Sequence, residues 1–144
     1  MDWPLGPLEA APSLDLLGPW GPEIAGLFTR PFLMMHRASE LYTARTCLLL
    51  LLDLGWEGRL RAGTSLDQLC QGLPDQARKP LAWMLPFLER EGLLHRTAET
   101  YTLSHEPDLD LAGIRRLMEA EAPGHAVNFD LLDGVRERIR PFFT

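Results

Sequence analysis

The sequence predicts a mainly α-helical fold that carries a single two-stranded β-hairpin. Apolar residues recur three and four positions apart over most of the chain, which is typical of helices with one buried face. Residues 93–104 instead contain two short runs of strand-forming residues on either side of Thr97-Ala98-Glu99. With 144 residues, 46% of them apolar and 24% charged, the chain has the size and composition of one globular domain.

The first 31 residues contain six of the twelve prolines and lack the pattern of a long helix. We interpret residues 1–21 as an extended arm and expect a short helix from Glu23 to Phe28. Seven large apolar side chains make the arm too apolar for a freely solvated tail: Trp3, Leu5, Leu8, Leu14, Leu16, Leu17 and Trp20. The arm is therefore expected to dock on a groove of this chain or of a partner.

The longest predicted helix begins after Pro31 and ends near Leu54, where Gly55 stops it. Leucines occupy five successive positions, 48–52, in its second half, and they point in every direction around the helix axis. One neighbouring element cannot cover all of them, so some must contact another element or another chain. We expect a homodimer that is formed through residues 1–54.

Two helices are predicted between residues 64 and 91. The first, Thr64 to Cys70, begins with a hydroxyl side chain and has an acidic or amide group about three residues later, the pattern of a capped helix. The second, Asp75 to Glu91, places its large apolar residues on one face, and a glycine follows it. Pro86 removes a hydrogen bond inside this helix and is expected to bend its last turns.

A hairpin and two more helices complete the predicted order. The strands Leu93–Arg96 and Thr100–Ser104 flank a short tip. A helix from Leu109 to Ala122 follows, and a last helix extends from Phe129 to about Arg140.

Residues 64–104 together resemble a winged helix-turn-helix: a capped short helix, a turn, a second helix and the hairpin EREGLLHRTAETYTLS. The chain is also similar, over roughly residues 32–143, to the N-terminal winged-helix domain of small-molecule S-adenosylmethionine-dependent methyltransferases. The stretches SLDQLCQGL, LEREGLL and ETYTLS carry this resemblance. Similar segments form lids on methyltransferases embedded in polyketide synthases, where NFDLLDGVRERIRPFFT resembles the helix that leads into the catalytic domain.

The resemblance implies an accessory role, dimerisation or a substrate lid in natural-product or polyketide biosynthesis, without catalysis by this chain alone. It divides the chain into the Pro-rich arm and short helix, residues 1–31, and a winged-helix domain, residues 32–144, that is truncated before a catalytic domain. Because the tail places Phe142 and Phe143 at its end, we expect a following domain or a second subunit to cover them.

The family's cofactor site uses an acidic-Gly-x-Gly-x-Gly turn between a strand and a helix. The glycine pairs Gly18/Gly21 and Gly55/Gly58 have neither this spacing nor an adjacent predicted strand. We therefore expect no cofactor to be bound by this chain alone, and S-adenosylmethionine to be bound by the missing catalytic domain.

Five residues are candidates for covering a substrate, on the basis of their size and chemistry: Tyr42, Arg45, Trp83, Phe142 and Phe143. We assign no catalytic residue and no metal ligand. Cys47 and Cys70 are interpreted as packed thiols, and the four histidines have no local signature of nucleophilic catalysis. The small polar cluster from His105 to Asp110 lacks the spacing of a calcium loop and is interpreted as a solvated loop.

The alternative function is that of a free-standing winged-helix transcription regulator that binds DNA. The net charge of −6 opposes this function, because a DNA-binding face needs excess positive charge. The second predicted helix carries acidic and basic residues in equal number: Asp75, Glu89 and Glu91 against Arg78, Lys79 and Arg90. An enzyme that acts alone is a third and weaker interpretation.

The sequence also predicts a cytoplasmic protein without a membrane partner. Its start lacks the positive and apolar regions of a signal peptide. The strongest apolar run, Cys47 to Leu52, is far shorter than the roughly 20 residues that cross a bilayer.

Overall fold

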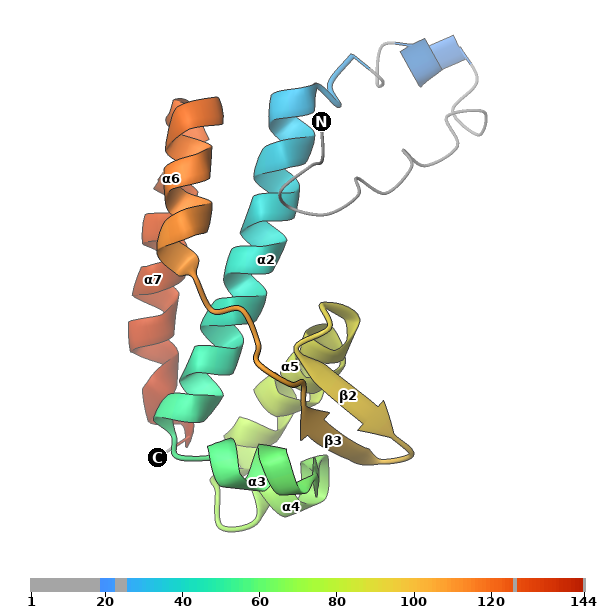
Figure 1. The fold of residues 1–144 in the computed structure, drawn as a ribbon, viewed down its shortest axis with the longest axis vertical. Helices are drawn as coiled ribbons and strands as arrows, with labels where there is room; N and C mark the ends of the chain where they lie inside the picture. The colour runs from blue at the N-terminus through green and yellow to red at the C-terminus, as the bar shows by residue number, and fades with distance from the viewer. Residues whose placement is uncertain (1–18, 23–25, 126, 144) are drawn as a thin grey trace.

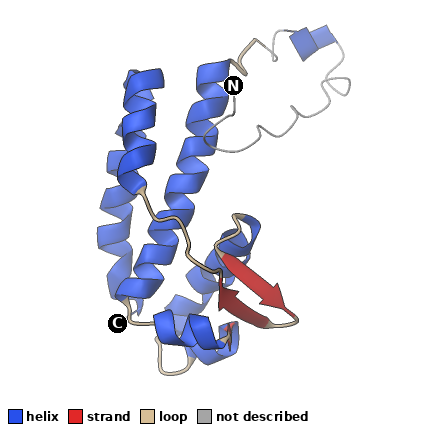
Figure 2. Cartoon of the chain, in the orientation of Figure 1, coloured by secondary structure: helices blue, strands red, loops and turns tan. Residues whose placement is uncertain are grey.

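The computed structural model describes residues 19–22, 26–125 and 127–143, and these form a mainly helical chain with a small antiparallel sheet (Figures 1 and 2). The predicted helical class and the predicted hairpin are confirmed at this level. Most of the predicted arm, residues 1–18, and the first half of the short helix predicted from Glu23 lie outside the described residues. Gly26 and Leu27 form a turn, so the second half of that helix is not present.

The longest helix, α2 (Arg30–Asp53), has the place that the sequence predicts. The hydroxyl oxygen of Thr29 accepts the backbone N–H of Phe32 at 3.4 Å and caps its start. Pro31 lies in the first turn, where its missing N–H costs nothing. Gly55 ends the helix region with φ of 79°, a left-handed conformation that favours glycine. No helix among the described residues is long and apolar enough to cross a membrane.

The chain after α2 forms α3 (Glu57–Ala62), β1 (Thr64–Ser65), α4 (Leu66–Cys70), the 3₁₀ turn η2 (Asp75–Ala77) and α5 (Arg78–Arg90). The predicted capping of α4 is confirmed. Ser65 Oγ accepts the N–H of Gln68 at 3.2 Å, and Gln68 Oε1 accepts the N–H of Ser65 at 2.8 Å. Neither α3 nor β1 is predicted from the sequence, because each is too short to show an apolar period.

The small sheet has three strands in the order β1-β3-β2, all antiparallel. β2 (Leu94–Thr97) and β3 (Thr100–Leu103) form the predicted hairpin, and Ala98 at its tip has φ of 54°. β1 pairs with the outer side of β3, where Thr64 faces Tyr101. The prediction of only two strands is therefore wrong, because the residues just before α4 are extended and add a third.

Two helices from the end of the chain pack along α2 (Figure 1). They are α6 (Leu111–Glu121) and α7 (Val127–Ile139), with the 3₁₀ turns η3 (Pro123–His125) between them and η4 (Arg140–Phe143) after them. The carboxylate of Asp110 accepts the N–H of Gly113 at 2.8 Å and caps α6. Both predicted helices are present, although α7 begins two residues earlier than expected.

The described residues form two hydrophobic clusters, and α2 contributes to both. The second half of α2 packs with α3, α4, α5 and the hairpin around Leu48, Leu60 and Leu88. Its first half packs with α6 and α7, where the rings of Tyr42 and Phe129 lie 4.7 Å apart. The helix α2 therefore packs against both groups of elements along its length (Figure 1).

This arrangement covers four of the five leucines of the α2 run within one chain. Leu48, Leu50 and Leu51 are between 0% and 3% exposed, and Leu52 packs against the same cluster. Leu49 is half-buried and belongs to neither hydrophobic cluster. The four covered leucines do not require a second subunit, which weakens the main reason for expecting an interface at residues 1–54. The homodimer itself stays a prediction.

The C-terminal turn η4 folds back onto the molecule beside η2. Phe143 is 3% exposed and lies edge-on to Trp56, with ring centroids 6.3 Å apart, whereas Phe142 is 47% exposed. The expectation that both phenylalanines need a cover from outside is wrong for Phe143, because the core around Trp56 already encloses it.

Candidate functional site: an apolar groove between three helices

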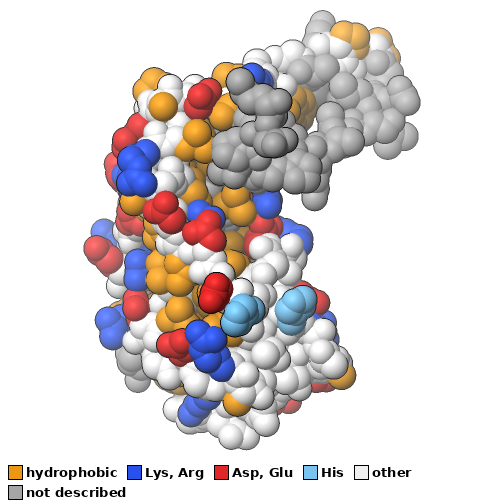
Figure 3. Space-filling model, in the orientation of Figure 1, with side chains coloured by type: hydrophobic (Ala, Val, Ile, Leu, Met, Phe, Trp, Pro, Cys, Tyr) orange, Lys and Arg blue, Asp and Glu red, His pale blue; other side chains and the backbone are white. Residues whose placement is uncertain are grey.

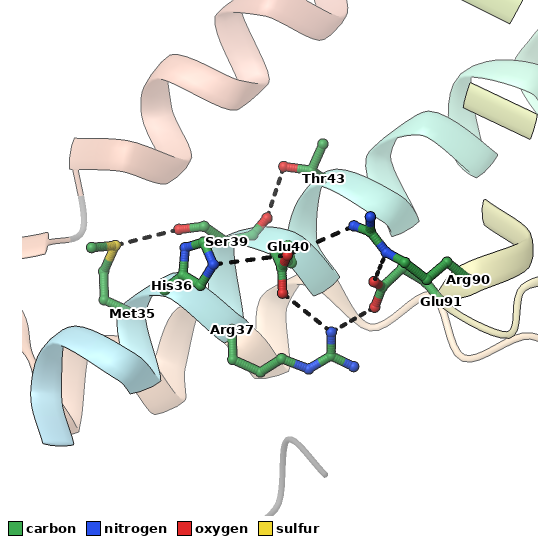
Figure 4. Close-up of polar contacts among 8 residues, drawn as sticks. All are labelled: Met35, His36, Arg37, Ser39, Glu40, Thr43, Arg90 and Glu91. Carbon is green, nitrogen blue, oxygen red and sulfur yellow. Dashed lines mark hydrogen bonds and ion pairs between the residues drawn. The ribbon is translucent and has the colours of Figure 1, made fainter. Parts of the chain in front are cut away.

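A groove of about 810 Å³ opens between α2, α5 and α7. This volume is in the range of small-molecule sites. On the α2 side the floor is formed by two small side chains one turn apart, Ser39 and Thr43. The hydroxyl of Thr43 donates to the backbone oxygen of Ser39 at 2.7 Å, so it turns back onto its own helix (Figure 4). Both side chains are small and line the groove from α2.

The α5 wall is aromatic. The indole of Trp83 is stacked on the ring of Phe87, with centroids 4.9 Å apart and planes at 21°. The guanidinium of Arg90 lies 5.0 Å from the same phenyl ring. The three side chains are about one helical turn apart, and Trp83 remains 56% exposed. The stack holds an indole at the groove in a fixed orientation.

The α7 wall is aliphatic. Leu131 and Val135 lie one turn apart and are 66% and 56% exposed, and the partly buried Leu132 lies between them. Large apolar side chains that are more than half exposed therefore face the groove from two helices. Isolated exposed apolar residues are common, but a cluster in a concave site marks a binding surface.

The polar groups of the groove are near the start of α2. There the sulfur of Met35 is the acceptor for two side chains, the hydroxyl of Ser39 at 3.6 Å and the amide nitrogen of Asn128 at 3.3 Å. Figure 4 shows the contact of Ser39 with Met35. Because a thioether is a weak acceptor, these two donors make only weak hydrogen bonds.

A network of charged side chains forms the rim beside this end (Figure 4). Arg37 contacts Glu91 at 2.7 Å and Glu40 at 3.4 Å. Arg90 contacts the same two carboxylates, at 3.3 Å and 3.7 Å, and His36 lies 3.8 Å from Glu40. The network ties α2 to the end of α5. Its two guanidinium groups offset its two carboxylates, so the rim offers no excess charge.

The structure does not bring the five candidate cover residues together. Trp83 lies in the groove, whereas Phe142 and Phe143 lie at the C-terminal turn. Tyr42 is buried against α7, where its hydroxyl donates to Asp133 at 2.8 Å, and burial raises the pKa of this tyrosine. Arg45 donates to the backbone oxygen of Asp110 at 3.1 Å.

Arg45 belongs to a separate hollow between α2 and α6, which also includes Asp108, its ion-pair partner. Figure 3 shows the face on which these two helices lie, with apolar side chains between charged ones. Here each charge has a local partner.

Sequence reasoning missed the groove residues Ser39, Asn128, Leu131 and Val135. The two apolar residues are one turn apart on α7, but that spacing is equally typical of a buried face. The small residues of α2 carry no signal, because their importance depends on which helices pack nearby.

Another hollow, of about 490 Å³ between α2 and α7, is lined by ionisable side chains: Tyr42, Asp53, Asp133, Arg136, Glu137 and Arg140. Across residues 19–22, 26–125 and 127–143, no cluster of three His, Cys, Asp or Glu side chains is arranged to hold a metal ion. Cys47 is buried, and burial raises the pKa of its thiol to about 11, so it is a protonated and weak nucleophile near neutral pH. His105 lies 3.8 Å from Glu106 in an exposed loop.

Comparisons with models of protein families, with curated proteins and with solved structures found no match to this chain.

Proposed function

We propose that this chain is a winged-helix accessory domain of an S-adenosylmethionine-dependent methyltransferase, acting in dimerisation or as a substrate lid. In this proposal α4 and α5 are the helix-turn-helix, and β2 and β3 with the added β1 are the wing. The order of the elements supports the proposal. The observation that carries it is the outward face of α5, which presents an exposed indole, Trp83, to an apolar groove of neutral charge.

A lid has to exclude water from a reacting centre, so it needs an apolar concave face on a rigid frame. The groove supplies the face, because Trp83, Leu131 and Val135 meet there. The Arg37–Glu91 ion pair and the packing along α2 supply the frame. The methyl transfer itself, with S-adenosylmethionine, would be left to a catalytic domain beyond Thr144.

The order of the elements also supports a second candidate, a winged-helix DNA-binding regulator, in which α5 would read bases. The cations that such a face needs are Arg78, Lys79 and Arg90 of α5 and the wing residue Arg96. Arg78 contacts Asp67 at 2.7 Å, Arg90 contacts Glu91 at 3.3 Å, and Arg96 contacts Glu99 at 3.2 Å. Lys79 is exposed and makes no ion pair among the described residues. Since three of these four cations are paired within the chain, the accessory role is the better fit.

The reading frame beyond Thr144 tests the accessory role directly. A downstream strand that is followed by an acidic residue and a glycine-rich turn would support it. A native stop codon after Thr144 would contradict the form in which one polypeptide carries both domains. Calorimetric titration of the 144-residue chain with S-adenosylmethionine should show no saturable heat.

A gel-shift series with duplex DNA over a range of salt concentrations separates the two candidates. The accessory role predicts no specific complex. Submicromolar binding that weakens steeply with salt would favour the regulator, because release of counterions from the phosphate backbone produces that slope.

A further inference from the structure

We infer that the groove between α2, α5 and α7 is a docking site for the N-terminal arm of the same chain, which binds there through residues 3–8 as a polyproline II helix. This goes beyond the proposed function, since it holds whether or not the chain serves a methyltransferase. Residues 1–18 lie outside the described residues, and their part in the interaction follows from their sequence.

Segment 3–8 has the pattern of a polyproline II ligand. Its sequence is Trp-Pro-Leu-Gly-Pro-Leu, in which Pro4 and Pro7 are three positions apart. A polyproline II helix has three residues per turn, so in this conformation the two proline rings share one side. Leu5 and Leu8 have the same spacing and share the adjacent side. The segment therefore presents two neighbouring apolar faces, and it carries no charged side chain.

The two apolar walls of the groove match these two faces. On α5 the indole of Trp83 is stacked on Phe87 and remains 56% exposed. Exposed aromatic side chains in a groove are the usual contact surface for proline rings. On α7 the aliphatic side chains of Leu131 and Val135 suit the leucine side. Because the rim offers no excess charge, an uncharged segment is a fitting occupant.

The donors of the groove favour a polyproline II segment over a helix. Ser39 and Asn128 donate to the sulfur of Met35, a weak acceptor, at 3.6 Å and 3.3 Å. Among the described residues, the indole N–H of Trp83 has no hydrogen-bond partner. A polyproline II segment makes no internal hydrogen bonds, so its carbonyl groups are free to accept from these donors. A helix uses most of its carbonyl groups internally and offers few acceptors.

The covalent connection selects this arm over a similar segment of another protein. Residues 9–29 join the segment to α2, and a chain of that length can span at most about 70 Å. Ser39 lies only about 14 Å along α2 from Arg30, so the connection is long enough. Tethering gives the segment an effective concentration of about 1 mM. An intrinsic dissociation constant of about 0.1 mM is then enough to fill the groove in about nine of ten molecules.

The consequence is a groove that the chain itself inhibits. Its walls are available to another molecule only in the fraction without a docked arm, about one in ten at that occupancy. The apparent affinity of any competitor for the groove is lowered about tenfold by the same factor.

The first test follows the indole N–H of Trp83 by nuclear magnetic resonance in the 144-residue chain, with Trp83→Phe to assign its signal. Exchange of this proton with water should be about tenfold faster in the double variant Pro4→Ala/Pro7→Ala, because the arm leaves the groove. Amides of α2, α5 and α7 that line the groove should shift in the same variant. Pro12→Ala is the matched control: it removes an arm proline outside the three-residue spacing and should change neither signal nor exchange.

The second test adds a synthetic peptide of residues 1–18. The peptide should bind the double variant saturably, and the parent chain about tenfold more weakly, because the parent's own arm competes. In the double variant, Trp83→Ala should weaken peptide binding about tenfold. Phe142→Ala in the same background is the control, since this exposed ring lies outside the groove, and affinity should be unchanged. Circular dichroism checks that each variant is folded.

Several outcomes would overturn the inference. These are equal exchange in the parent and the double variant, an equal effect of Pro12→Ala, or peptide binding that Trp83→Ala leaves intact. Slow exchange that is lost on dilution, with a dimer in analytical ultracentrifugation, would also overturn it, since the occupant would then be the arm of a second copy. None of these results bears on the reading-frame test of the accessory role.

Discussion

At the scale of single residues, the carboxylate of Glu91 is nearly buried and is held by two ion pairs. Its side chain is 4% exposed, and it contacts Arg37 and Arg90, which come from two different helices. A nearly buried carboxylate is stable only while its partners remain, and the partners in turn depend on it. The residue after the end of α5 thereby fixes how α5 lies against α2.

We predict that Glu91→Gln lowers the free energy of unfolding by about 1–2 kcal/mol, because charge-assisted hydrogen bonds are lost while both guanidiniums are partly hydrated. Urea unfolding measures the change. Glu99→Gln is the matched control: Glu99 pairs with Arg96 but is 86% exposed, so the change should stay within about 0.5 kcal/mol. Equal effects of the two substitutions would show that burial of Glu91 is unimportant.

We predict that Cys47 makes the free energy of unfolding change with pH in the alkaline range. Burial raises the pKa of its thiol from an ordinary 9.0 to about 11, so the unfolded chain loses this proton at lower pH than the folded chain. The stabilising contribution is therefore complete below pH 9 and is lost as the pH rises to about 11. Cys47→Ala should unfold with a shallower decline of stability over this interval, measured by urea titration at several pH values.

The control for this pH dependence is Cys70→Ala, which removes the thiol that the core only partly covers. Its decline of stability should follow that of the parent chain. A parent-like slope in Cys47→Ala would contradict the role of the buried thiol. A thiol reagent at neutral pH should label Cys70 before Cys47.

At the scale of elements, the turn after α2 depends on backbone conformation and not on packing. Gly55 has φ of 79°, and a Cβ added there would meet nothing within 4 Å. Gly58 lies inside α3, and a Cβ there is equally free of contacts. Both positions have space for a Cβ. Substitution of the two glycines by alanine therefore separates the effect of backbone strain from the effect of helix propensity.

We predict that Gly55→Ala lowers the free energy of unfolding by about 1 kcal/mol or more, because an L-residue is strained at positive φ. Gly58→Ala should raise it by about 0.5–1 kcal/mol, because alanine is the better helix former. Thermal unfolding of both variants tests the opposite signs. A change of the same sign in both would mean that conformation does not decide the effect.

Sequence reasoning found the elements that have a capping or stop residue at one end, or an apolar pattern that repeats over many turns. Ser65 caps α4, Gly55 follows α2 and Gly92 follows α5, and the apolar spacing of α2 continues over many turns. The elements that it missed, α3 and β1, have six and two residues, too few for any period. β1 is extended because it pairs with β3, and a pairing between distant segments leaves no local trace.

At the scale of the whole molecule, the groove is a product of packing that no segment encodes alone. Leu131 and Val135 read as an ordinary buried stripe, yet α7 contacts α2 through Phe129 and leaves them outside. The reverse holds for the leucine run of α2. It predicts a surface for another chain, but four of its five leucines pack in the cluster with α3, α5 and the hairpin. Whether a side chain is buried depends on which elements pack against it. Sequence periodicity therefore predicted where the helices lie along the chain, but not which of their sides are exposed.

The C-terminal turn η4 connects α7 to the hydrophobic cluster around Trp56. η4 follows α7, which packs on the first half of α2, but its last ring enters the other hydrophobic cluster beside Trp56. Phe143 therefore links two groups of elements, the cluster formed by α3, α4 and α5 and the helix pair α6 and α7. Loss of this ring should destabilise both groups.

We predict that Phe143→Ala lowers the free energy of unfolding by about 3 kcal/mol, because a fully enclosed ring leaves a cavity that the core cannot close. Phe142→Ala is the matched control. Its ring is 47% exposed, so the loss should be below about 1 kcal/mol. Hydrogen exchange should show faster opening in α5 and α7 together in Phe143→Ala. If only α7 opened faster, the turn would belong to that helix alone, because a ring that holds two units together must loosen both when it is removed.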